Sequence, residues 1–242
     1  MNPISNVLYT ISYMGLPLLL AMVLHEYAHG WVADRHGDDT ARMDGRLTMN
    51  PLAHIDPFGT VILPLLCLIL PGSFFLGWAK PVPVNPARLR NPRRDMALVA
   101  AAGPGMNLLL AIASGLLLSG LLTIDPTLMT SWPPQPGQVP RRDLTGMLLL
   151  PLAAMALYSV FINVLLMAFN LIPIPPLDGG RILVSLLPPG PALALSRFEP
   201  YGMLLIVALI MFDPQIHVIR LITGTLVSAM AGTILSTTGV TE

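Results

Sequence analysis

Long apolar stretches with very few charges between them dominate this sequence. Only 11% of its 242 residues are Asp, Glu, Lys or Arg, and the mean hydropathy is +0.70. Soluble domains carry about 25% charged residues, so this chain has too few charges to cover a water-facing surface. Lipid is therefore the expected solvent, and the length allows one membrane domain. The formal net charge of zero argues against a nucleic-acid partner.

Stretches of about 20 mostly apolar residues predict membrane-spanning helices. Three of them form the expected core, at about 7–33, 96–122 and 147–172. Two more helices are expected within 198–236, separated at Asp213-Pro214. A backbone exposed to lipid must satisfy its hydrogen bonds internally, so every span is predicted to be helical. We expect an all-α polytopic membrane protein, a single domain over 1–242 with five or six transmembrane or re-entrant helices around a three-helix catalytic core.

The distribution of Lys and Arg predicts the orientation in the cell membrane. Residues 34–95 hold eight of these cations, whereas the loop 123–146 holds two. Basic loops face the cytoplasm, so 34–95 is predicted to lie inside and 123–146 outside. The apolar segment 58–78 has basic flanks on both sides and is predicted to be a re-entrant hairpin that turns at Pro71-Gly72. The single cysteine, Cys67, lies in this segment and is expected to be a buried small hydrophobe.

The first span contains the sequence His25-Glu26-Tyr27-Ala28-His29. Positions i and i+4 lie on one face of a helix, so both imidazoles can reach one zinc ion. Glu26, between them, is placed to take a proton from a water, as in HExxH metalloproteases. Ionisable groups inside a spanning helix are costly and by default functional. The alternative is a set of snorkelling polar groups near a helix end.

A catalytic zinc ion usually has three protein ligands, so a third must come from elsewhere in the chain. Asp178 is the best candidate, because it follows the 147–172 span. The predicted orientation places the end of this span at the same cytoplasmic depth as His25 and His29. The alternative for Asp178 is a helix cap or a turn residue before Gly179-Gly180.

Four polar residues are weaker candidates. Asn170 is a possible substrate clamp or oxyanion donor, with a helix-end hydrogen bond as the alternative. Asn85 could meet an extended substrate, or lie in a turn at the membrane edge. Asn107 is a third possible substrate contact, although tight helix packing is favoured for it and for Gly103. His54 is a possible regulatory zinc ligand.

Four segments in chain order resemble the site-2 protease family of intramembrane metalloproteases, in its compact branch without PDZ or CBS domains. They are His25-Glu26-Tyr27-Ala28-His29-Gly30, Gly77 to Pro86, Ala101 to Asn107, and Asn170 to Arg181. The resemblance implies one zinc ion per chain held by His25, His29 and Asp178, with Glu26 as the general base. It implies hydroxide attack on peptide carbonyls of transmembrane substrate helices or signal-peptide remnants. The extra apolar piece 58–70 departs from many relatives.

Two other functions would also place His and Asp residues or helix-binding surfaces in a membrane: metal transport and an inactive scaffold. A metal transporter is expected to show a chain of ligands across the bilayer and can carry internal repeats, but here the candidates cluster on one side. An inactive scaffold is expected to lack one catalytic group, but His25, Glu26, His29 and Asp178 are all present.

Overall fold

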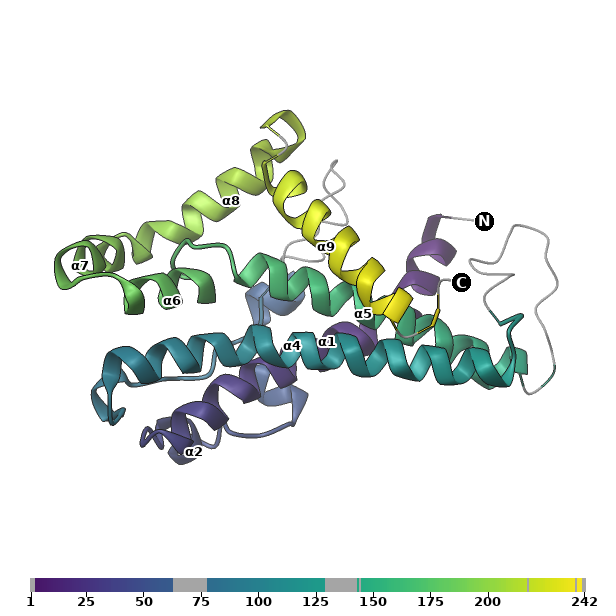
Figure 1. Ribbon diagram of the computed structural model, residues 1–242, viewed down its shortest axis with the longest axis horizontal. Coiled ribbons are helices and arrows are strands. Elements are labelled where there is room, and N and C mark those ends of the chain that lie inside the picture. Colours follow the sequence, from purple (N-terminus) through teal and green to yellow (C-terminus); the bar gives the residue numbers. More distant parts are fainter. Residues whose placement is uncertain are drawn as a thin grey trace. The chain divides into compact units, whose positions relative to one another are not determined.

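The computed structural model describes residues 3–62, 78–128, 143, 145–216, 218–237 and 239–240. Within these ranges the chain forms helices and loops and no β-strand, as the all-α prediction requires (Figure 1). Two described segments, Pro92–Ile124 and Thr145–Asn170, are long and apolar enough to cross a membrane. The fold is that of an all-α membrane protein, and its number of crossings stays a prediction. The turn of the predicted hairpin, Cys67 and most of the loop 123–146 lie outside the described residues.

The longer helices follow the apolar runs of the sequence. α1 covers Pro3–Arg35, α4 Pro92–Ile124, α5 Leu150–Asn170, α8 Glu199–Ile216 and α9 Val218–Thr237. The shorter α helices are α2 (Thr40–Met43), α6 (Asp178–Leu186) and α7 (Pro189–Arg197). Short 3-10 helices cover Pro51–His54 and Pro86–Arg88, and π-helical turns cover Pro57–Ile62 and Thr145–Leu149.

The predicted helix break at Asp213-Pro214 is wrong in position. α8 continues through both residues and ends at Ile216. Pro214 lacks the N–H for one helical hydrogen bond, but the helix continues only two residues beyond it. Prolines also lie inside α1 and α4, at Pro17 and Pro104.

The chain divides into two compact units. The first combines 1–21, 107–166 and 225–242, and the second combines 22–106 and 167–224. In the first unit, the Asn107 side chain donates to Asn163 Oδ1 at 2.9 Å and to the carbonyl of Ala21 at 3.4 Å. Ser114 and Ser159 add a hydroxyl pair between α4 and α5 at 2.8 Å. These polar bonds, buried at Asn107 and half-buried at the two serines, join the first unit's parts of α1, α4 and α5.

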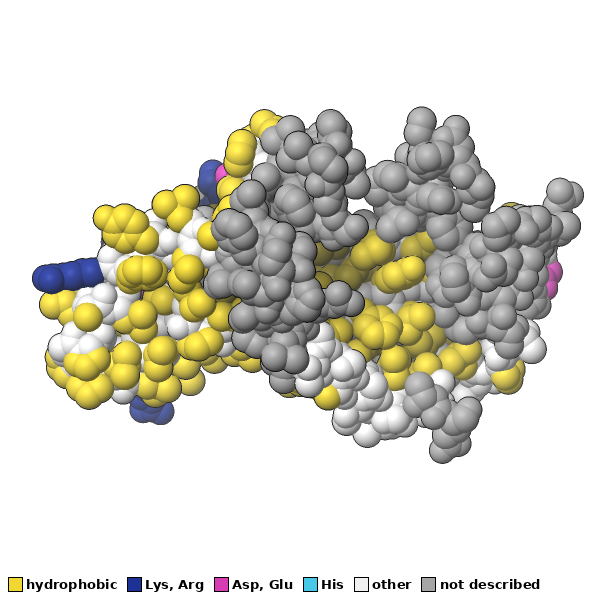
Figure 2. All heavy atoms as spheres, turned by 90° about the horizontal axis from the view of Figure 1, so that it is seen from above, with side chains coloured by type: hydrophobic (Ala, Val, Ile, Leu, Met, Phe, Trp, Pro, Cys, Tyr) yellow, Lys and Arg dark blue, Asp and Glu magenta, His cyan; other side chains and the backbone are white. Residues whose placement is uncertain are grey.

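The second unit holds the predicted site. Its segments of α1 and α4 meet in a small apolar cluster formed by Ala33, Leu89 and Val99. The carboxylate of Asp95 accepts from the backbone N–H of Asn91 at 2.7 Å and so caps the start of α4. Hydrophobic side chains cover much of the described surface in Figure 2, and charged side chains are few there. Such a surface suits lipid contact.

Candidate metal centre

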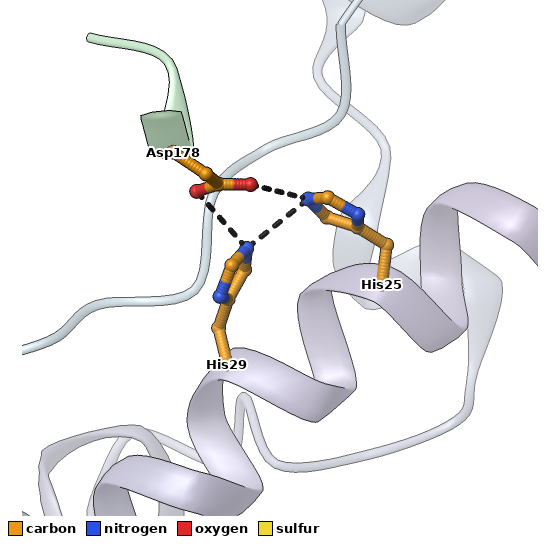
Figure 3. A group of neighbouring side chains, drawn as sticks. All are labelled: His25, His29 and Asp178. Carbon is orange, nitrogen blue, oxygen red and sulfur yellow. Dashed lines mark hydrogen bonds and ion pairs between the residues drawn. The ribbon is translucent and has the colours of Figure 1, made fainter. Parts of the chain in front are cut away.

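The two histidines of the HExxH sequence point the same way from α1 (Figure 3). Their Nε2 atoms lie 3.1 Å apart, and the rings meet edge to face with centroids 4.7 Å apart. Both residues are buried, at 7% and 8% exposure. The i, i+4 spacing therefore places two ligand atoms together away from bulk water.

Asp178, the first residue of α6, brings its carboxylate to the same point. Its Oδ2 lies 3.2 Å from Nε2 of His25, and its Oδ1 lies 3.3 Å from Nε2 of His29. One ligand atom from each of the three residues falls within 4.8 Å of the others. Residues separated by about 150 positions in the sequence thus converge on one small volume.

The turn between α5 and α6 fixes where Asp178 lies. Close backbone packing holds this turn, because a Cβ at Gly179 would overlap the carbonyls of Leu171 and Ile172. A Cβ at Gly180 would likewise meet the backbone of Pro175. Leu177 occupies the N-cap position, so Asp178 lies in the first helical turn. A carboxylate there is favoured by the partial positive charge of the helix N-terminus.

The protonation of His29 follows from its second ring nitrogen. Nδ1 of His29 lies 2.7 Å from the carbonyl of Val99, and a carbonyl only accepts, so Nδ1 carries the hydrogen. In the neutral ring Nε2 then presents a lone pair toward Asp178 and His25. A backbone carbonyl in this position orients metal-binding histidines in many proteins.

The three groups together require a cation or an extra proton. Burial alone would raise the pKa of Asp178, but the two imidazoles outweigh burial and hold the pKa of this carboxyl well below its usual range. Its buried Oδ2 has no hydrogen-bond partner among the described residues, although Nε2 of His25 lies 3.2 Å away. One carboxylate and two imidazole nitrogens form a donor set that suits divalent zinc. The residues present therefore fit a metal ion.

Gly103 on α4 leaves the space that the imidazoles occupy. A Cβ at this position would lie 2.6 Å from Nε2 of His25 and would also overlap Nε2 of His29. The sequence predicted tight helix packing for Gly103, and the structure shows which groups require it.

Glu26 is half-buried, and its carboxylate is held by a distant backbone amide. The N–H of Val82 donates to Glu26 Oε2 at 2.8 Å. Val82 is buried in the extended segment 78–85, which follows the undescribed part of the predicted hairpin. This bond fixes the orientation of the Glu26 carboxylate.

The weaker candidates have other partners. Asn85 caps a 3-10 turn through a bond from Ala87 N–H to its Oδ1 at 3.1 Å. Asn107 is buried in the first unit among the hydrogen bonds given above. Asn170 is the half-buried last residue of α5. His54 is buried, its Nε2 lies 2.8 Å from the Thr48 carbonyl, and the three-residue group does not include it. Substrate or regulatory roles for these four stay predictions.

Three contacts near the site were not predicted from the sequence. They join the carbonyl of Val99 to His29, the N–H of Val82 to Glu26, and the buried carboxylate of Asp38 to the N–H of Asn85. A backbone group carries no sequence signal. Only Asp38, an acid beside a glycine turn, offered a residue type that could have been noticed.

Comparison with known proteins places this site in a family context. The profile of Peptidase family M50 matches residues 13–212. The chain is 39% identical to “Putative zinc metalloprotease YwhC” of Bacillus subtilis over 81% of this chain and 79% of that protein. It is 31% identical to “Putative zinc metalloprotease Rip2” of Mycolicibacterium smegmatis, over 83% of this chain and 69% of that protein. No solved structure matches the chain.

Proposed function

Because this chain belongs to peptidase family M50, the site-2 protease family, we propose that it is a zinc-dependent endopeptidase that cuts transmembrane segments. The convergence of His25, His29 and Asp178 on one buried point carries the proposal. These residues would hold the metal through two imidazole nitrogens and a carboxylate oxygen, which leaves a fourth position open. Ionised Asp178 and Glu26 would balance the charge of Zn²⁺, which eases burial among apolar helices.

A bound zinc ion would supply a Lewis acid and lower the pKa of a water toward about 7. Glu26 is assigned the role of general base. Its carboxylate accepts the proton of the attacking water and later passes it to the leaving amine. The Val82 N–H, 2.8 Å from Oε2, holds the carboxylate in one orientation for both transfers.

The substrates are proposed to be helices of membrane proteins or remnants of signal peptides. Several arguments support this class: the apolar surface, the buried site and the family. Helical hydrogen bonds shield peptide carbonyls, so the substrate must unwind before it is cut. Lys and Arg in 34–95 support a multi-pass arrangement with the site near the cytoplasmic side.

The test compares purified wild type with Glu26→Gln on a model transmembrane substrate, together with zinc analysis. Loss of cleavage with zinc retained at one ion per chain is expected, because glutamine keeps the shape of the side chain but cannot take a proton. Glu199→Gln is the matched control, since Glu199 lies in α8, pairs with Arg181 at 3.5 Å and is outside the three-residue group. Equal cleavage by wild type and Glu26→Gln would exclude this role for Glu26.

A further inference from the structure

An extended strap, residues 78–85, passes beside Glu26. Its sequence is Trp78-Ala79-Lys80-Pro81-Val82-Pro83-Val84-Asn85, followed by Pro86. A residue that precedes proline is restricted to extended backbone, which applies to Lys80, Val82 and Asn85. The prolines therefore disfavour helical backbone at these three positions, and Pro81 and Pro83 have no N–H of their own. In the middle of the strap, the Val82 N–H donates to Glu26 at 2.8 Å.

Two side chains fasten this strap on either side of Val82. Nη2 of Arg46 donates to the carbonyl of Lys80 at 2.8 Å and to the carbonyl of Pro81 at 3.1 Å. Oδ2 of Asp38 accepts from the N–H of Asn85 at 2.6 Å. Hydrogen bonds with one ionised partner are about twice as strong as neutral ones. The strap is thus fixed immediately before and three residues after the amide that contacts Glu26.

Burial and a local hydrogen bond hold the Asp38 side chain in place. It is fully buried at 0% exposure, and its Oδ1 accepts from the N–H of Thr40 at 3.1 Å. A second backbone bond supports the strap near Arg46, since Lys80 N–H donates to the carbonyl of His54 at 2.9 Å. The strap therefore cannot shift at one end without breaking bonds to buried groups.

We propose that Arg46 and Asp38 are positioning residues, which act through the strap to aim the carboxylate of Glu26. The inference rests on the proposed function and deepens it. Neither side chain belongs to the metal-binding group, so their loss changes the direction of Glu26 without removing a ligand. A misplacement of about 1 Å at a reacting group costs on the order of 100-fold in rate.

The experiment uses the full chain in detergent micelles, loaded with zinc, and the variants Arg46→Met, Arg46→Lys and Asp38→Asn. Prolines leave the segment 80–86 with four amide hydrogens, those of Lys80, Val82, Val84 and Asn85. Hydrogen exchange resolved by mass spectrometry can follow them individually. Arg46→Met is expected to speed exchange at Val82 by at least about tenfold, because the amide separates from Glu26. Asp38→Asn is expected to speed exchange most at Asn85.

The kinetic prediction separates positioning from a general structural role. Arg46→Met is expected to lower kcat by about 10- to 100-fold with KM within about threefold and zinc content unchanged. Arg46→Lys, which keeps a charged donor, is expected to recover part of kcat and part of the amide protection. Arg42→Met is the matched control, because Arg42 is exposed and pairs with Asp34 at 3.0 Å, away from the strap.

Two results would overturn the proposal. One is an Arg46→Met protein that folds and binds zinc with wild-type exchange at Val82. The other is equal loss of zinc and thermal stability in all three variants, since that pattern would mark a folding role alone. If the wild-type protein cuts no substrate, the proposed function fails, whereas the exchange measurement still tests the link between the strap and Glu26.

Discussion

Gly103 in α4 lies directly against the imidazole of His29 in α1, at a position where no side chain would fit. The same glycine faces the His25 ring, and a Cβ there would come within 2.6 Å of its Nε2. One hydrogen atom in place of a methyl group thus keeps two candidate ligands in place. Two residues further along the helix, Gly105 has nothing within 4 Å of the corresponding position.

Gly103→Ala is expected to lower zinc affinity by at least about tenfold, because the added methyl must push both imidazoles away from Asp178. Gly105→Ala is the matched control and is expected to bind zinc normally. It should be slightly more stable, since alanine is favoured over glycine in a helix by about 1 kcal/mol. Zinc titration of the two purified variants checks the prediction, and equal affinities would contradict the arrangement around Gly103.

Asp178→Asn tests the third ligand with almost no change in shape. The loss of groups that only support a ligand costs about 10- to 100-fold in metal affinity, so removal of the charged ligand is expected to cost at least about 100-fold. Helix α6 should persist, because asparagine and aspartate have nearly the same shape and similar helix propensities. Metal content after dialysis against a weak chelator is the measurement. Asp44→Asn, at an exposed carboxylate, is the control, and full zinc retention by Asp178→Asn would require another ligand.

The Asn107–Asn163 bond should contribute measurable stability to the first unit. Both side chains are buried, at 0% and 1% exposure, and their amides lie 2.9 Å apart. Each single change to alanine is expected to lower the free energy of unfolding by about 1–3 kcal/mol, because it leaves a buried polar group unpaired. Hydrogen bonds between membrane helices average about 0.6 kcal/mol in double-mutant cycles, with a maximum near 1.7. SDS-induced unfolding of wild type, both single variants and the double variant gives the coupling energy between Asn107 and Asn163. A coupling energy of zero would contradict the bond.

The sequence is sufficient to predict the helical fold and to select the three residues, His25, His29 and Asp178, that the structure brings to one point. Apolar runs define α4 and α5, and the spacing of His25 and His29 puts two imidazoles on one helix face. Asp178 can be selected because few Asp or Glu residues lie near a helix end at the predicted membrane depth of the two histidines. These inferences use only the type of each residue and its spacing along the chain, and both can be read from the sequence.

The contacts that orient the site could not be predicted in the same way. The bond from Val82 to Glu26 joins a backbone amide to a side chain 56 residues away, and a backbone amide has no residue type. In the sequence, Arg46 and Asp38 are charged residues in a loop, and only the structure shows that they bind the strap. The end of α8 was not predicted either, since the helix continues through Asp213-Pro214, a pair that the local pattern marks as a break.

Substitution of Gly179 tests whether the position of Asp178 matters independently of its carboxylate. A Cβ at Gly179 would overlap the backbone carbonyls of Leu171 and Ile172, and backbone cannot move aside as a side chain can. Gly179→Ala is therefore expected to displace the first turn of α6, lowering the free energy of unfolding by about 1–3 kcal/mol as well as zinc affinity. Asp178→Asn should lose zinc affinity while the metal-free protein keeps its stability.

The control for this comparison is Gly190→Ala, because Gly190 in α7 has nothing within 4 Å of its would-be Cβ. Thermal unfolding of Gly179→Ala, Asp178→Asn and Gly190→Ala, each with zinc and with chelator, compares their stability in the two states. If Gly179→Ala and Gly190→Ala are equally stable both with zinc and with chelator, the close packing of the turn does not fix Asp178. If the metal-free Gly179→Ala protein alone is destabilised, the turn between α5 and α6 holds the carboxylate in place before any metal binds.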